Sequence, residues 1–204
     1  MADQTSGQAK SLSDAELQDL VASTDTGGRA PTNRNIALLI SGLALAWSLF
    51  QLWIAQPMLW FGQYLPVMNS SQTRPIHLMF AIVLAFLAYP ALKNSPRDRI
   101  PLTDWVLAGI GFFCTFYVFW FSDYLADTAR SGLPTEFQVY LGAVGLLVLL
   151  EASRRALGPA LTIVGSLFLL YAYMGQGWLI PELIEHEGLS FNALINAQWL
   201  DTAG

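Results

Sequence analysis

Long stretches without an Asp, Glu, Lys or Arg alternate with short polar segments along this chain. Five runs are free of these charges: residues 35–73, 75–92, 105–122, 137–150 and 156–181. A helix needs about 20 mostly apolar residues to cross the roughly 30 Å hydrocarbon core of a bilayer. The pattern therefore predicts an all-α integral membrane protein with about five transmembrane helices.

Prolines and polar residues indicate where these helices begin and end. Pro57 ends or kinks the first span, because proline lacks an amide hydrogen and clashes with the preceding helical turn. Thr103 or Asp104 is expected to cap the third span. The nine residues 58–66 are too few to cross, so we interpret them as a re-entrant or interfacial segment. Apart from the fourth, the predicted spans are residues 35–55, 76–92, 105–122 and 159–174.

The fourth span is the weakest, because only 14 uncharged residues separate Glu136 from Glu151. It becomes long enough if Pro134 takes the first helical position. The side chains of Glu151, Arg154 and Arg155 would then have to reach out to the membrane surface. The prediction of five spans depends on this extension.

Both ends of the chain are expected to carry short amphipathic surface helices. In the polar tail of residues 1–34, Ser13 and Glu16 have the spacing of a capping box. A flexible polar tail explains that segment equally well. Beyond the fifth span, apolar side chains recur at helical spacing; they are Phe191, Leu194, Ile195 and Trp199.

Composition supports a membrane location and argues against nucleic-acid binding. Hydrophobic residues make up 54% of the chain and charged residues only 12%, about half the share in an average soluble domain. The net charge of −5 gives none of the basic excess that nucleic acid requires. The lipid bilayer is therefore the first expected partner, and no nucleic acid is expected.

Basic residues predict the orientation of the chain, because Lys and Arg near span ends are retained on the cytoplasmic side. With five alternating spans, only Arg74 and Arg130 fall on one side. The other eight fall together: Lys10, Arg29, Arg34, Lys93, Arg97, Arg99, Arg154 and Arg155. We therefore predict a cytoplasmic N-terminus and place residue 204 on the outer side.

The sequence shows no pattern typical of catalysis. It has no glycine-rich phosphate loop, no metal-binding spacing of Cys and His, and no nucleophile near a base. We therefore expect no enzyme activity, no cofactor and no metal. Arg74 and His77 are polar candidates at the outer end of the second span. His77 is either a proton- or anion-binding group or, more simply, an anchor for the helix end.

The segment LLEASRRALGPALTIVG, residues 149–165, joins the fourth and fifth spans. Arg154 and Arg155 lie three and four residues after Glu151, which predicts ion pairs on one helix face. The two arginines are expected to hold this turn at the cytoplasmic surface. Gly158 and Pro159 break the helix and start the next one, which makes the turn a hinge candidate rather than a binding site.

Several segments carry a family likeness. The turn shows Leu-Glu-Ala-x-Arg-Arg at 150–155, Gly-x-Ala-Leu at 158–161 and Leu-Tyr-Ala at 170–172. Residues 74–90 read RPIHLMFAIVLAFLAYP, and residues 188–204 read GLSFNALINAQWLDTAG. With these motifs the chain, from about residue 25 to residue 204, resembles the fused permeases of tripartite ATP-independent periplasmic (TRAP) transporters that work with TAXI-type binding proteins.

The resemblance implies three regions: a cytoplasmic tail at 1–34, a four-helix domain like the small (Q-type) subunit at 35–155, and a fifth helix with a periplasmic linker at 156–204. The linker would lead to a large (M-type) transport domain. In this family, a periplasmic TAXI-type binding protein delivers an organic acid. The large domain carries it across the bacterial inner membrane, driven by a sodium or proton gradient.

The resemblance also implies that the substrate and ion sites lie beyond residue 204, so it transfers no transport residue to this chain. The alternative is a self-standing multi-pass membrane adaptor or interaction protein without a transport role.

Overall fold

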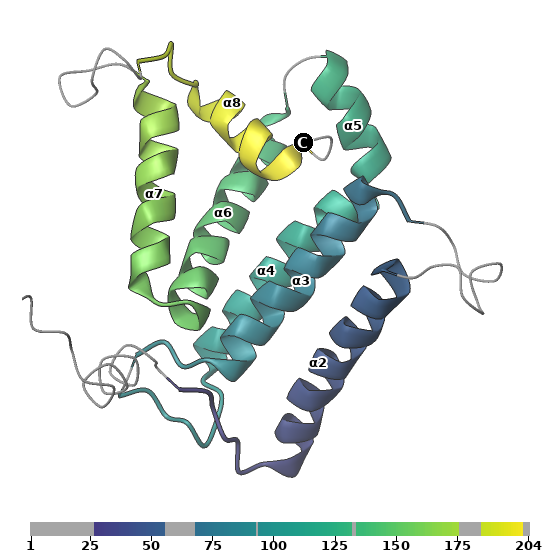
Figure 1. Cartoon of the computed structure of the whole chain (residues 1–204), viewed down its shortest axis with the longest axis vertical. Helices are drawn as coiled ribbons and strands as arrows, with labels where there is room; N and C mark the ends of the chain where they lie inside the picture. The colour runs from purple at the N-terminus through teal and green to yellow at the C-terminus, as the bar shows by residue number, and fades with distance from the viewer. Residues whose placement is uncertain (1–26, 56–67, 93, 132–133, 176–184, 202–204) are drawn as a thin grey trace, which may run out of the picture.

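In the computed structural model, the described residues are 27–55, 68–92, 94–131, 134–175 and 185–201, and every regular element among them is a helix (Figure 1). Among these described residues, four helices are long and apolar enough to cross a membrane: α2 (Arg34–Ala55), α3 (Ser70–Ala88), α4 (Leu102–Trp120) and α6 (Glu136–Ala156). These helices confirm the all-α class and fit a multi-pass membrane protein. The helix expected near Ser13 and the segment 58–66 lie outside the described residues.

A shorter apolar helix, α7 (Pro159–Met174), has the bounds predicted for the fifth span. Its 16 residues extend about 24 Å at the α-helical rise of 1.5 Å per residue. This length is below that of a hydrocarbon core, so α7 stands apart from the four longer helices.

Local capping explains why α3 differs from its predicted bounds. It begins at Ser70 because the side chain of Asn69 accepts a hydrogen bond from the Gln72 amide at 2.9 Å. It ends at Ala88 rather than at residue 92, since Tyr89 is extended, as residues before a proline tend to be. The predicted bounds of 76–92 are therefore shifted at both ends.

The expected cap of the third span is wrong. Helix α4 begins directly after Pro101, which places Thr103 and Asp104 inside its first turn. A side chain in the first turn cannot take the N-cap position, which lies one residue before the helix. Asp104 is instead buried, and its contacts are described below.

The start of α6 is set by a capping box rather than by proline. The Thr135 amide donates to Gln138 Oε1 at 2.8 Å, and the Gln138 amide donates to Thr135 Oγ1 at 3.4 Å. Pro134 therefore precedes the helix and does not occupy its first position, contrary to the prediction. The helix continues through Glu151 to Ala156, so the fourth span has the length that the prediction required.

A short helix that the sequence did not suggest, α5 (Ser122–Ser131), follows α4 directly. The chain bends at Phe121, whose amide donates to the Tyr117 carbonyl at 3.0 Å. Leu125 is buried and anchors α5 to the bundle. The polar composition of this segment hid its helical character from a search for apolar runs.

The core lies where α3, α4 and α6 meet. Gly111 of α4 lets Ile82 of α3 and Val148 of α6 approach closely, because a Cβ at this position would lie 2.3 Å from Ile82 Cγ2 and 3.2 Å from Val148 Cγ1. Helix α2 packs on α3, and α7 packs on α6. Figure 1 shows α2 and α7 at opposite edges of this bundle.

The C-terminal segment folds back and packs its apolar face onto α6. It consists of α8 (Phe191–Ile195) and the π-helical turn η2 (Asn196–Leu200). Ile195 contacts α6 at Gly142, and the ring of Trp199 lies on Gly145. Leu194, Ile195 and Trp199 are buried, whereas Phe191 is exposed, so most of the predicted apolar face packs inside the bundle.

Candidate functional site

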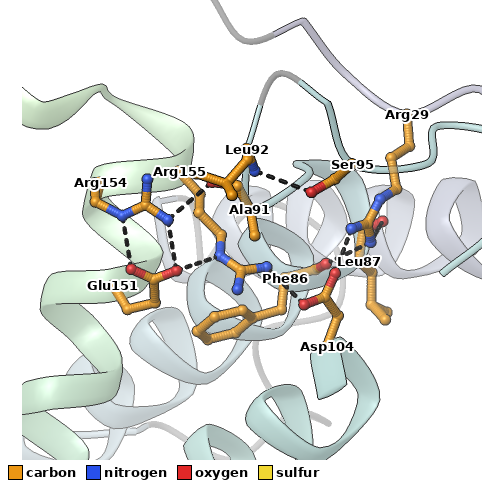
Figure 2. Close-up of polar contacts among 10 residues, drawn as sticks. All are labelled: Arg29, Phe86, Leu87, Ala91, Leu92, Ser95, Asp104, Glu151, Arg154 and Arg155. Atoms are coloured by element: carbon orange, nitrogen blue, oxygen red, sulfur yellow. Dashed lines mark hydrogen bonds and ion pairs between the residues drawn. The ribbon is translucent and has the colours of Figure 1, made fainter. Parts of the chain in front are cut away.

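Five charged side chains meet where α2 and α4 begin and where α3 and α6 end, which we call the charged end (Figure 2). They are Arg29, Asp104, Glu151, Arg154 and Arg155. They come from three parts of the chain: the segment before α2, the first turn of α4 and the last turns of α6. Three guanidinium groups thus face two carboxylates, and we call this set the charge network.

Asp104 is the centre of the charge network. Its carboxylate is only 3% exposed, is paired with Arg29, and lies 2.8 Å from Nη1 of Arg155. Because Asp104 stands in the first turn of α4, the positive end of the helix dipole also favours its negative charge. A single carboxylate therefore joins the segment before α2 to the end of α6.

Arg29 closes the end of α3. Its side chain is fully buried, its Nη1 donates to the Phe86 carbonyl at 3.0 Å, and its backbone amide donates to the Ala88 carbonyl at 2.7 Å. The last carbonyls of a helix have no partner within the helix, and a cation near them is favourable. Arg29 thus stabilises the end of α3 and the buried charge of Asp104 at the same time.

Glu151 forms both ion pairs that its spacing predicts. Its carboxylate accepts from Arg154 Nε and Nη2 at 2.7 and 2.8 Å, and from Arg155 Nε at 2.7 Å. Arg154 also donates to the Ala91 carbonyl at 2.9 Å. The local pairing is confirmed, and through Arg154 it also holds the connection between α3 and α4.

Arg155 does not reach out to the surface, contrary to the prediction. Its side chain is 4% exposed, against 35% for Arg154. The guanidinium lies 4.7 Å from the centre of the Phe86 ring, where cation–π attraction adds to the pairing with Asp104. The inward site gives Arg155 a carboxylate and an aromatic face, whereas the surface would give it only water or lipid headgroups.

Gly158 and Pro159 form the turn that follows the charge network. Gly158 has a φ of +87° at the N-cap of α7, and Pro159 is the first residue of that helix. The break predicted at these residues is therefore confirmed. Leu157 still belongs to the end of α6, since its amide donates to the Ser153 carbonyl at 2.8 Å.

Substituting Gly158 with alanine is expected to lower the free energy of unfolding by about 1–3 kcal/mol, because its backbone, with φ +87° and ψ 170°, has a conformation that essentially only glycine adopts. Space is not the cause, because a Cβ there would meet no atom within 4 Å. Denaturant unfolding in detergent micelles measures the difference. Unchanged stability would show that the turn has another conformation.

Arg74 and His77 lie near the opposite end of the bundle and have different surroundings. Arg74 lines a cavity of about 240 Å³ together with Thr115, Trp199 and Asp201. His77 does not line this cavity and contacts α2 instead.

His77 joins α3 to α2. Its Nδ1 accepts a hydrogen bond from Trp47 Nε1 at 3.1 Å, and its ring lies edge-on to Phe50 with 5.1 Å between the ring centres. This geometry agrees with the simpler interpretation of His77 as an anchor.

No protein-family model, curated protein or solved structure matches this chain.

Sequence reasoning missed two of the five members of the charge network, Arg29 and Asp104. Arg29 entered only as one positive charge near a span, and Asp104 only as a cap. The available signal was that Asp104 directly precedes an apolar run of 18 residues, where a carboxylate needs a cationic partner. Which of the ten basic residues pair with Asp104 can be seen only in the folded structure.

The charge network acts as an electrostatic clamp on helix ends. Each carboxylate is contacted by two arginines, so the two charges are used in holding α3, α4 and α6 together. Among the described residues, no group of three or more His, Cys, Asp and Glu side chains is placed to hold a metal ion.

Proposed function

We propose that this chain is the membrane scaffold region of a TRAP permease in the bacterial inner membrane. Residues 35–155 would form the Q-type-like domain, and residues 156–204 would connect it to a large M-type transport domain. The scaffold would support gradient-driven uptake of an organic acid that a periplasmic TAXI-type binding protein delivers. The proposal rests on the family resemblance of the sequence motifs together with the architecture of the charged end.

The observation that carries the proposal is the charge network. A scaffold has to keep its shape while a partner domain moves against it. Buried ion pairs between sequence-distant segments define one arrangement of helix ends, because breaking them leaves uncompensated charges away from water. Asp104 and Arg155 are 51 residues apart in sequence, and their contact fixes the start of α4 against the end of α6.

Apolar edges of the bundle leave room for lipid and for a large partner domain. Helix α7 has no buried residue, and α2 has only Phe50. Both helices are otherwise apolar and lie at opposite edges (Figure 1). In the proposed assembly, α7 is the fifth span and precedes the linker to the M-type domain.

The distribution of arginines supports a cytoplasmic charged end. Arg74 is the only arginine with a described side chain at the opposite end. At the charged end the described arginines are Arg29, Arg34, Arg97, Arg99, Arg154 and Arg155. Since basic residues are retained in the cytoplasm, the proposal places the start of α2 there.

Solute uptake by cells that carry or lack the gene tests this function. Deletion is expected to abolish binding-protein-dependent uptake of one labelled organic acid from a panel, and the gene supplied in trans should restore it. Uptake should stop when the sodium or proton gradient is collapsed and should continue when ATP is depleted with the gradient maintained.

The reading frame after codon 204 gives an independent check. Several hundred further codons of apolar sequence and a neighbouring binding-protein gene are expected. A stop codon without such a neighbour, together with unchanged uptake of every acid after deletion, would refute the permease and favour the membrane adaptor.

A further inference from the structure

Three arginines of the charged end lie outside the charge network and are exposed: Arg34, Arg97 and Arg99. Arg34 is the first residue of α2, and the other two belong to the connection between α3 and α4. The intervening Asp98 is also exposed. The set therefore carries three positive charges and one negative charge.

Backbone hydrogen bonds hold these two segments together. The Ala30 amide donates to the Arg97 carbonyl at 3.2 Å, and the Thr32 amide donates to the Asp98 carbonyl at 3.0 Å. Figure 1 shows the segment before α2 beside the α3–α4 connection at the same end of the bundle. Arginines from distant parts of the sequence are thus fixed on one surface.

Exposed leucines border this basic surface. Leu38, one turn after Arg34, is 59% exposed, and Leu102, three residues after Arg99, is 78% exposed. Both leucines belong to helices that are long and apolar enough to cross a membrane. The surface therefore changes from guanidinium to hydrocarbon within about one helical turn, as the boundary between lipid headgroups and acyl chains does.

We propose that Arg34 and Arg99 bind the phosphate of an anionic phospholipid, whose acyl chains lie along Leu38 and Leu102. Guanidinium groups bind phosphate through paired, charge-assisted hydrogen bonds, and basic surfaces next to transmembrane helices attract anionic headgroups. The flanking leucines favour a lipid over a soluble anion. The site requires only that α2 and α4 cross a bilayer, and it goes beyond the proposed transport function.

Lipid binding to the purified full chain in detergent tests the site. Native mass spectrometry would compare the affinity for phosphatidylglycerol with that for phosphatidylcholine. Arg34→Gln and Arg99→Gln are each expected to weaken phosphatidylglycerol binding about fivefold, with phosphatidylcholine unchanged. Arg74→Gln removes the same charge near the opposite end and should leave the preference at the wild-type value.

A substitution of opposite sign separates electrostatics from misfolding. Asp98→Asn removes the negative charge of the surface and keeps the backbone carbonyl that Thr32 contacts, so phosphatidylglycerol binding should strengthen by several-fold. If an arginine variant fails to fold, Asp98→Asn still tests whether the charge of this surface determines phosphatidylglycerol binding. An unchanged lipid preference in Asp98→Asn would overturn the proposal.

Free glycerol phosphate distinguishes a lipid site from a site for soluble phosphate. At millimolar concentration it is expected to leave bound phosphatidylglycerol in place, because it lacks the acyl chains that the leucines contact. Displacement of the lipid at that concentration would also overturn the proposal. Both measurements are independent of solute uptake, so failure of the lipid site and failure of the transport proposal are distinguishable.

Discussion

Replacing Asp104 with asparagine is expected to lower the free energy of unfolding by about 3–5 kcal/mol, the usual effect of removing one partner from a buried ion pair. The variant leaves Arg29, fully buried, and Arg155, 4% exposed, facing a neutral amide. Denaturant unfolding in detergent micelles measures the loss. Asp98→Asn makes the same change at an exposed position and should alter stability by less than about 0.5 kcal/mol.

A second substitution shows whether the loss comes from uncompensated charge. Arg29→Gln in the Asp104→Asn background removes one of the stranded guanidinium groups. The double variant is expected to lose less than the sum of the two single losses, because residues in one ion-pair network are coupled. Additive losses, or equal stability of Asp104→Asn and Asp98→Asn, would show that Asp104 does not hold the helix ends together.

Replacing Gly145 with alanine is expected to lower stability by about 1–3 kcal/mol through overpacking and to release the C-terminal segment. A Cβ at this position would lie 2.2 Å from Cζ2 and 2.4 Å from Cε2 of Trp199. These atoms belong to a rigid, buried ring. Unfolding in micelles measures stability, and maleimide labelling of a Leu200→Cys variant reports release, because Leu200 is 1% exposed in the closed segment.

Gly109→Ala is the matched control for this change. Gly109 also lies inside a long apolar helix, but a Cβ there would meet no atom within 4 Å. The Gly109→Ala substitution should stabilise the protein by about 0.5–1 kcal/mol, the usual gain from replacing a glycine within a helix. Trp199→Phe should partly rescue Gly145→Ala by removing the clashing ring atoms. Equal effects of the two alanines would contradict the contact between Trp199 and Gly145.

The long helices could be predicted because their formation depends on local composition. Four of the five uncharged runs have 18 or more residues, which is long enough to require a hydrogen-bonded backbone in a membrane, and Pro159 starts α7 as expected. The pairs of Glu151 with Arg154 and Arg155 were also predictable, since residues three and four apart share a helix face. The start of α6 was harder to predict from the sequence, because Pro134 and Thr135 are both residue types that commonly begin a helix.

The buried part of the charge network could not be predicted, because its members are distant in sequence. Arg29 and Asp104 are 75 residues apart, and no sequence spacing selects that pair from the ten basic residues of the chain. Arg155 has the same local spacing whether it faces the core or the surface. Its inward position follows from Phe86 and Asp104, which only helix packing brings within reach.

The charge network also sets an order for biogenesis. At about 5–20 residues per second, the ribosome adds Asp104 several seconds after Arg29, from which it is separated by 75 residues, and adds Arg155 another 51 residues later. Before Asp104 is added, Arg29 has no carboxylate of the charge network to pair with. Closure of the charge network therefore requires the segment before α2, the start of α4 and the end of α6 all to have been synthesised and brought together. A nascent chain stopped between Asp104 and Glu151 can form the pair of Arg29 with Asp104, but the contacts that hold the end of α6 are still missing.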